Sequence, residues 1–239
     1  MLEYLKLQDL LFLDIETVPA FAEFEQLPEP LQPLFLKKTE RLRGSDESDA
    51  DHYFNTAGIY AEFGKVICIS LGAFKQENGT YYLKIKTCSG DDEKGILQDF
   101  LQIITRESAA GKKFCGHNIR EFDIPFLCRR MLIQGIALPE VLDFSGKKPW
   151  EVQVVDTLQL WSFGDKKHFT SLKLLALLLG IDSPKEEMEG KDVGRVYWKE
   201  RNLPRIVEYC EKDVITVAQL ILRFKGMPLL RPEQISPSR

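Results

Sequence analysis

Two carboxylates, Asp14 and Glu16, stand two residues apart at the end of an uninterrupted apolar run over residues 10–13. Such a run, without helical gaps, is typical of a strand buried on both faces at the centre of a sheet. Because successive side chains of a strand alternate between its faces, the two carboxylates point to the same side. Like charges in a poorly solvated place cost stability unless a cation is bound there. The pair indicates either a metal site or two ordinary solvated acids at a strand end.

Three further residues with possible chemistry follow in two other places. Asp123 stands where a loop enters a helix, and by itself it reads as an N-cap aspartate. Tyr209 and Asp213 are four residues apart in the last helix, so they share one of its faces. Taken alone, this pair is equally typical of a solvated acid beside a tyrosine at the edge of the core.

As a set, these motifs resemble those of the ribonuclease-H-like 3′–5′ exonucleases. They are Asp-x-Glu on a strand, Asn-x-x-x-Phe-Asp at a strand–loop–helix junction and Tyr-x-x-x-Asp on the last helix. The match is to the subclass with four acids and a tyrosine (DEDDy), and the chain looks like a family-B DNA polymerase proofreading exonuclease domain standing alone. The resemblance covers roughly residues 10 to 224, and residues 62–70 and 116–118 also look like that family. The sister subclass carries histidine where Glu208 stands here.

The resemblance implies a two-metal phosphodiesterase that releases nucleoside 5′-monophosphates from a 3′ end. Its cofactors would be two divalent cations, Mg²⁺ or Mn²⁺, which suit ligands made only of carboxylate oxygens. Carried over by motif, Asp14 would bridge both ions, and Glu16 and Asp213 would help to hold the ion that activates water. Asp123 would serve the second ion through water, and Tyr209 would orient the attacking water.

The same resemblance implies contacts to the substrate. Thr17, Asn118 and Phe122 fall where the family touches the 3′-terminal nucleotide, Phe122 by stacking unless it is a core residue. His117 is either a phosphate contact or a hydrogen-bonded structural histidine. Asp156 ends a strand before Thr157, so it either supports the site or caps a helix.

The expected substrate is single-stranded nucleic acid, and DNA is favoured over RNA. An exoribonuclease is the first alternative, because the choice depends on contacts to the 2′-hydroxyl. The second is a non-catalytic module that uses this fold to bind nucleic acid or protein. No polymerase motifs accompany the exonuclease motifs, so proofreading or DNA repair would need a polymerase or repair partner. Residues 147–148 and 166–168 are candidate contacts to the nucleic-acid backbone, or plain solvated lysines.

Composition limits the other functional classes. The chain has 239 residues and a net charge of −4, so any nucleic-acid contact must come from a local basic patch. Its five cysteines include no Cys-x-x-Cys pair, which favours reduced thiols in the cytoplasm over disulfides or a zinc site. No secretory signal or membrane-spanning apolar stretch is recognised, and we expect a cytoplasmic protein without a membrane partner.

These residues need a scaffold, and the apolar patterns predict an α/β fold. Three strands come first and form an antiparallel unit, with a hairpin turn at residues 77–79. Helices and strands then alternate, which predicts a mixed, ribonuclease-H-like sheet with parallel strands added and helices on both faces. The expected strands are residues 10–17, 65–74, 80–88 and 152–157, and residues 113–118 are expected to be a short strand that runs into a loop. The expected helices span about 92–104, 123–132, 171–179 and 202–224.

The domain expectation is a single exonuclease domain over residues 1–239. Residues 19–63 stand apart within it, as an insertion or mobile excursion from the core. Four prolines break regular structure early in this stretch, and residues 37–51 carry mixed charges, as a surface loop or helix does.

Overall fold

The structure is a computed structural model that describes residues 2–148, 151–165, 169–181 and 188–237. Residues 166–168, one of the two candidate lysine stretches, therefore lie outside the described part. The sheet has six strands in the order β5-β4-β1-β2-β3-β6. The strand bounds are β1 Leu10–Pro19, β2 Gly64–Glu77, β3 Thr80–Ser89, β4 Lys113–Gly116, β5 Val155–Asp156 and β6 Ile235–Ser236.

The strand directions confirm the expected mixed sheet. β1, β2 and β3 are consecutive antiparallel strands, and β4 and β5 add to the other edge of β1 in parallel. Asn78 and Gly79 both have positive φ at the tip of the β2–β3 hairpin, as the turn signal predicts. β1 therefore lies inside the sheet, with its carboxyl end beside the carboxyl ends of β4 and β5. Such an edge is where α/β sheets place their sites.

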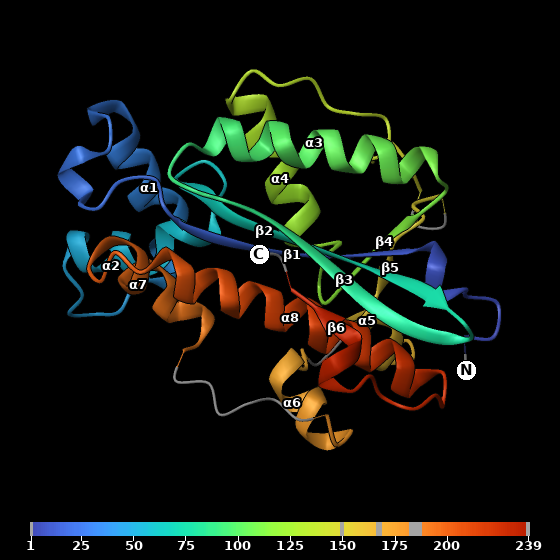
Figure 1. The fold of residues 1–239 in the computed structure, drawn as a ribbon. Coiled ribbons are helices and arrows are strands. Elements are labelled where there is room, and N and C mark those ends of the chain that lie inside the picture. The colour runs from blue at the N-terminus through green and yellow to red at the C-terminus, as the bar shows by residue number, and fades with distance from the viewer. Residues whose placement is uncertain (1, 149–150, 166–168, 182–187, 238–239) are drawn as a thin grey trace.

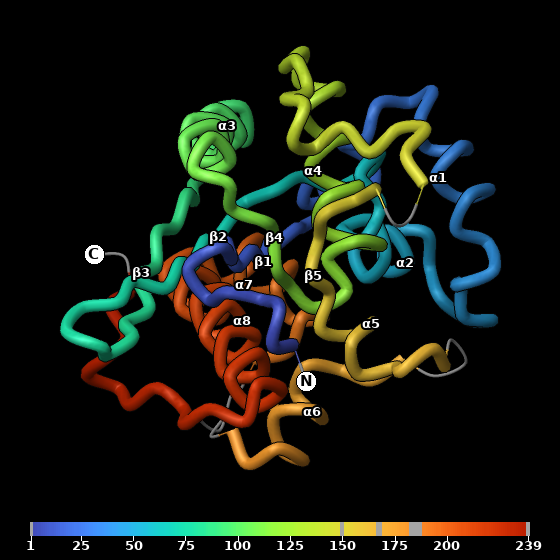
Figure 2. Tube along the Cα trace, turned by 90° about the vertical axis from the view of Figure 1, so that its right-hand side faces the viewer, coloured from blue at the N-terminus to red at the C-terminus, as the bar shows by residue number. Residues whose placement is uncertain are grey.

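Helices cover both faces of this sheet. α3 and α4 lie on one face, and α8 and α6 lie on the other (Figure 1). A view turned by 90° shows the strands between α3 and α8 (Figure 2). The helix bounds are α1 Gln32–Thr39, α2 Asp49–Thr56, α3 Glu93–Ala109, α4 Asp123–Ile133, α5 Thr157–Ser162, α6 Leu172–Leu178, α7 Val193–Trp198 and α8 Leu203–Phe224. Among the described residues, no helix combines the length and apolar character needed to cross a membrane.

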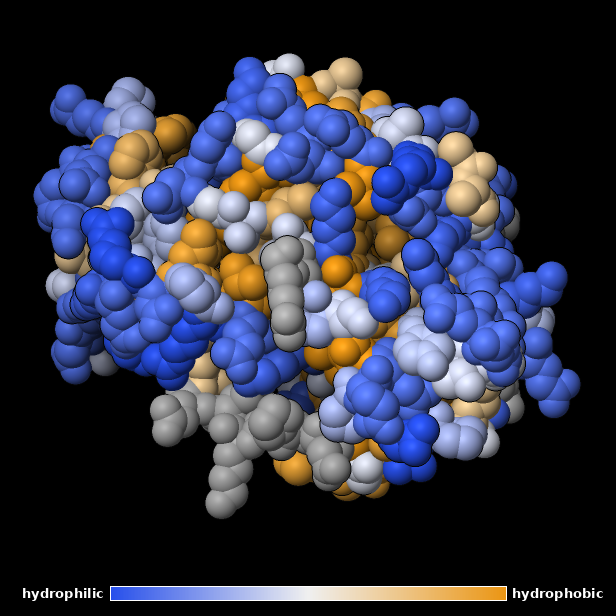
Figure 3. Space-filling view, viewed as in Figure 1, coloured by the Kyte–Doolittle hydropathy of each residue, from blue (hydrophilic) through white to orange (hydrophobic). Residues whose placement is uncertain are grey.

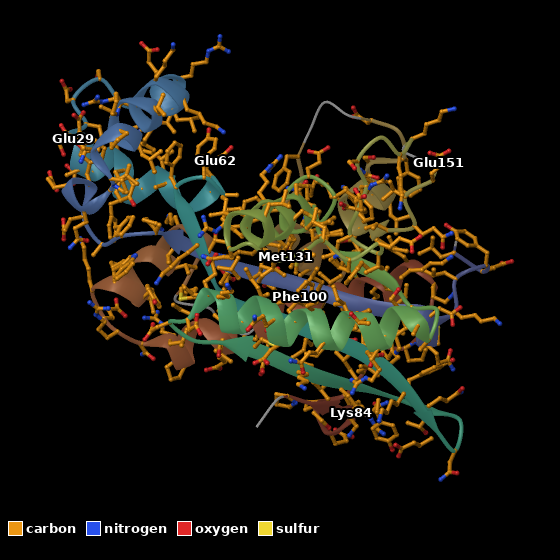
Figure 4. The ribbon with its side chains drawn as sticks, turned by 90° about the horizontal axis from the view of Figure 1, so that it is seen from above. Glu29, Glu62, Lys84, Phe100, Met131 and Glu151 are labelled. Carbon is orange, nitrogen blue, oxygen red and sulfur yellow. The ribbon has the colours of Figure 1, made fainter. Side chains whose placement is uncertain are left out.

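The side chains of β1 alternate between two cores. Leu11 and Leu13 join the core under α3 and α4, which also holds Phe100 and Met131; the latter two are labelled in Figure 4, on the helices above the sheet. Phe12, by contrast, packs with the residues of α8. Asp14 has the same parity as Phe12, so the alternation turns it toward α8.

The surface on the α3 side carries a groove away from these acids. The face shown in Figure 3 is largely hydrophilic, with apolar residues visible near its middle. A groove between α3 and the strands is lined in part by Leu11, Leu71 and Ile103. Leu71 and Ile103 belong to the core under α3 and α4, so this groove lies on the opposite side of the sheet from α8.

The strand expected at residues 152–157 is wrong in length. β5 contains two residues, paired through Cys115 with Val155 and Gly116 with Asp156. The strand cannot extend forward because the Asp156 carboxylate accepts the first free N–H groups of α5 and begins that helix. β5 lies at the edge of the sheet beside a four-residue strand, so the β-branched residues before it have little to pair with.

Residues 19–63 contain α1 and α2 and lie at the end of the sheet where β1 ends (Figure 1). Their apolar side chains form a small core of their own, in which Phe35 and Tyr53 are fully buried. This segment touches the main strand directly, because the Thr17 hydroxyl donates to the backbone oxygen of Gly58 at 2.7 Å. It is thus a neighbour of the carboxylate-bearing end of β1.

Candidate active site

β1 presents Asp14 and Glu16 side by side. In the β1–β2 ladder Asp14 stands opposite Ser70 and Glu16 opposite Cys68, with an irregularity in register immediately after Glu16. Glu16 is 7% exposed, so its carboxyl group is nearly removed from water. The strand therefore places two acids in a poorly solvated position, as the apolar run before them predicts.

The end of β4 brings Asp123 to the same place. β4 pairs with β1 only as far as Phe12 opposite Cys115, and the chain then turns away after Gly116. A Cβ at Gly116 would lie 2.9 Å from the backbone oxygen of Leu13, so this close approach requires glycine. Beyond that point the N–H of Ile15 donates instead to the Oδ1 of Asp123, at 3.2 Å. Asp123 is the first residue of α4 and is 5% exposed.

α8 supplies the last pair. Asn202 caps the helix by accepting from the N–H of Arg205, and the apolar stripe of the helix packs on the sheet. Tyr209 and Asp213 both line a cavity of ≈ 320 Å³ between α8 and α6, together with Ser171 and Thr216. The predicted shared face is therefore confirmed, and it borders an open space large enough for part of a small substrate.

The negative charge of Asp213 links it to the other three acids. Burial, followed by the negative charges of Asp213 and Asp123, raises the pKa of Asp14 well above its usual range. Burial and the charges of Asp14 and Asp213 do the same to the pKa of Glu16. Burial raises the pKa of Asp123 to about 7, with further contributions from Asp156 and Asp213. One charge, on Asp213, therefore acts on the three other acids.

The donor set fits divalent cations. The Oδ2 atom of Asp14 is buried and has no hydrogen-bond partner, which is costly for a polar atom. The negative charge of Asp213 raises the pKa of each of the other three acids, an effect that a neutralising cation would reverse. Oxygen ligands of this kind suit Mg²⁺ or Mn²⁺. Asp14, Glu16, Asp123 and Asp213 are the residues that would hold them.

Three of the expected substrate contacts lie around these acids. The hydroxyl of Thr17 donates a hydrogen bond to the backbone oxygen of Gly58, within residues 19–63. Asn118 has a positive φ of 61°, and its backbone oxygen accepts from the N–H groups of Glu121 and Phe122. Phe122 is partly exposed and packs against the core under α4. The centroid of its ring lies 5.6 Å from that of the Phe126 ring.

His117 is held by two hydrogen bonds. Its Nδ1 lies 3.0 Å from the hydroxyl of Thr157, and its Nε2 lies 2.9 Å from the backbone oxygen of Thr170. Burial lowers the pKa of the ring. These contacts favour the structural role over the phosphate contact, because both nitrogens already have partners inside the protein.

Asp156 performs both of the roles that the sequence left open. Its carboxylate is 3% exposed and caps α5 through the N–H groups of Leu158 and Gln159. It also accepts from the N–H groups of Asn118 and Arg120, at 3.1 and 3.2 Å. Asp156 therefore fixes the loop that leads from β4 to Asp123.

Sequence reasoning did not single out Cys210. Its sulfur donates to the backbone oxygen of Asp14 at 3.4 Å, and the thiol lies next to the carboxylates of Asp14 and Glu16. The signal was available, because Cys210 adjoins Tyr209 and lies three residues before Asp213 on the same helix.

Comparison with known proteins agrees with this geometry. Residues 59–229 match the model of a family described as predicted 3′–5′ exonucleases related to the exonuclease domain of PolB. The match includes Asp123, Tyr209 and Asp213, and it begins after Asp14 and Glu16. No curated protein matches the chain.

Among solved structures, the chain is similar to the family B DNA polymerase from the hyperthermophilic archaeon Pyrobaculum calidifontis. The sequence identity is 15% and the TM-score 0.51. The alignment covers 90% of this chain and 24% of the polymerase, so the chain spans about a quarter of that protein. At this identity the likeness concerns the fold, and it confirms the expected ribonuclease-H-like architecture.

Proposed function

The chain belongs to the family of predicted 3′–5′ exonucleases related to the exonuclease domain of PolB, and on that premise we propose that it removes nucleotides from the 3′ end of single-stranded nucleic acid, with DNA preferred to RNA. One observation carries the proposal. Asp14, Glu16 and Asp123 lie together, each with a raised pKa, and Asp213 contributes its charge to all three. Cations beside these acids would favour their carboxylate forms.

Two divalent cations bound by these acids would activate a water molecule and stabilise the leaving oxygen of the scissile phosphate. Each acid has a support suited to this task. Asp14 and Glu16 extend from the central strand, and Asp123 is fixed to that strand through the N–H of Ile15. Asp213 projects from the longest helix, which is packed along the sheet. Ligands on such elements hold their relative positions with little reorganisation.

Tyr209 is proposed to orient the attacking water. It lines the same cavity as Asp213, one helical turn away, and it is partly buried. A phenolic hydroxyl both donates and accepts hydrogen bonds. It can therefore hold a water molecule in a fixed orientation while that water attacks phosphorus. This role needs the hydroxyl and not merely the ring.

The 3′-terminal nucleotide is proposed to bind against the loop between β4 and α4. Phe122 has a partly exposed ring for stacking on a base, and Asn118 has an amide for polar contact. Asp156 supports this loop through two backbone N–H groups. A role in proofreading or repair would bring the domain beside a separate polymerase or repair protein.

Digestion of two matched oligonucleotides, one DNA and one RNA, each labelled at the 5′ end, tests the proposal. With Mn²⁺ the DNA should give a descending ladder of labelled products, and the RNA a slower one. Immediate release of the labelled 5′ nucleotide alone would show the opposite polarity. A faster RNA ladder would reverse the substrate preference and leave the polarity standing. Asp213→Asn, purified in parallel, controls for contaminating nucleases.

A further inference from the structure

A thiol completes a group of possible metal ligands beside the paired acids. Asp14, Glu16 and Cys210 each offer one ligand atom, and these three atoms lie within 4.8 Å of one another. The sulfur is additionally held 3.4 Å from the backbone oxygen of Asp14. The ligand atoms come from a central strand and a long helix, and the hydrolytic roles proposed above make no use of the sulfur.

Sulfur changes which cations a site prefers. Carboxylate oxygens suit Mg²⁺ and Mn²⁺, whereas thiolate ligands select zinc and other soft ions. A tetrahedral zinc with bonds of about 2.0 to 2.3 Å holds its ligand atoms roughly 3.5 Å apart. Atoms that already lie within 4.8 Å therefore need only small side-chain movements to reach that spacing.

The thiol is buried, whereas Asp14 reaches the surface. Cys210 is fully buried, in a cluster with Val18, Cys68 and Ile206. Asp14 is partly exposed, and its buried Oδ2 atom has no hydrogen-bond partner. An ion would therefore reach this group from the exposed side of Asp14.

We propose that Asp14, Glu16 and Cys210 form a mixed oxygen–sulfur site for a thiophilic divalent cation, Zn²⁺ or Cd²⁺, which competes with Mg²⁺ or Mn²⁺. The inference rests on the proposed function, because it takes Asp14 and Glu16 as metal ligands. As the metal–sulfur bond forms, the Cys210 thiol releases its proton to solvent. The two acids are then engaged with the soft ion, so this form of the protein is inactive.

Ultraviolet absorption of the full chain with Cd²⁺, without nucleic acid, tests the site. A cadmium–thiolate bond gives a ligand-to-metal charge-transfer band. We expect this band in the chelator-stripped wild type, its loss in Cys210→Ser and its retention in Cys88→Ser, a buried cysteine in the core under α3. Asp14→Asn should weaken Cd²⁺ binding by about 10-fold or more, the scale seen when a metal site loses a supporting group.

Competition in the wild type provides a test that needs no variant to fold. Because Mn²⁺ would share Asp14 and Glu16, adding Mn²⁺ should progressively remove the band. An absent band, a band that persists in Cys210→Ser, or a band indifferent to Mn²⁺ overturns the site. The proposed nuclease activity is judged separately, by 3′ shortening in Mn²⁺ without Cd²⁺, so either idea can fail while the other stands.

Discussion

The backbone N–H of Ile15 donates to the Oδ1 of Asp123 across 3.2 Å, which joins the central strand to the first residue of α4. Ile15 stands between Asp14 and Glu16, so this bond sets the position of the third acid relative to the first two. It forms because β4 ends at Gly116 and leaves the edge of β1 free beyond that point. Because β4 is short, Asp123 can bond to β1 next to Asp14 and Glu16.

The raised pKa of Asp123 predicts how stability depends on pH without metal. A carboxyl group whose pKa is about 7 in the folded protein and near 4 in the unfolded chain binds protons more tightly when folded. Its contribution is present below about pH 4 and is lost as the pH rises toward and through about 7. Asp123→Asn keeps an oxygen for the N–H of Ile15 but does not titrate. Thermal melts in chelator between about pH 5 and 8 should show a shallower decline for Asp123→Asn, and equal slopes would contradict this pKa.

Metal binding should reverse that destabilisation. A ligand that binds only the folded state adds about 2.7 kcal/mol at a concentration 100 times its Kd. We expect Mn²⁺ to raise the melting temperature of the wild type and to have much less effect on Asp14→Asn. The exposed Asp143→Asn is the matched control and should respond as the wild type does. An unchanged wild-type melting curve at millimolar Mn²⁺ would count against converging ligands.

Tyr209→Phe isolates the proposed water-orienting hydroxyl. The variant keeps the ring and its packing, so folding and oligonucleotide affinity should barely change. The turnover rate should fall by about 10²-fold, the low end for a positioned group in proton transfer. Tyr4→Phe, at a residue that is 80% exposed, should be silent. A fully active Tyr209→Phe enzyme would remove Tyr209 from the site and leave the four acids in place.

Asp156→Ala should be strongly destabilising, although no metal role is proposed for Asp156. The change leaves backbone N–H groups of Asn118 and Arg120 without their acceptor, at a cost of about 1–3 kcal/mol for each group that stays buried. Urea denaturation should show a loss of about 3 kcal/mol, against no more than about 0.5 kcal/mol for the exposed Asp143→Ala. Similar losses for the two variants would mean that Asp156 does not hold the loop.

Much of the fold follows from local patterns in the sequence. The apolar run before Asp14 predicts a central strand, and the turn at Asn78 and Gly79 predicts the β2–β3 hairpin. Asn202 and the apolar stripe after it predict α8. These signals succeed because periodicity and capping are properties of adjacent residues.

The remaining features depend on distant partners. β5 is shorter than its β-branched sequence suggests because its pairing is limited by β4, and β6 exists only through its pairing with β3. The four acids could be proposed from motif order, and a supporting role was one of two alternatives for Asp156. The acceptor of the Ile15 N–H and the backbone groups that Asp156 holds could not be proposed. Both involve hydrogen bonds between residues 36 or more positions apart, which no local pattern encodes.

The rate of 3′ shortening, measured against free metal concentration, tests the proposed two-metal site most directly. The assay uses a 5′-labelled single-stranded DNA and chelator-stripped protein. We predict no shortening in excess chelator and full recovery when Mn²⁺ or Mg²⁺ is restored. Asp213→Asn should stay nearly inactive at every metal concentration, because it has lost a ligand. Shortening at an undiminished rate in excess chelator would contradict the two-metal site formed by Asp14, Glu16, Asp123 and Asp213.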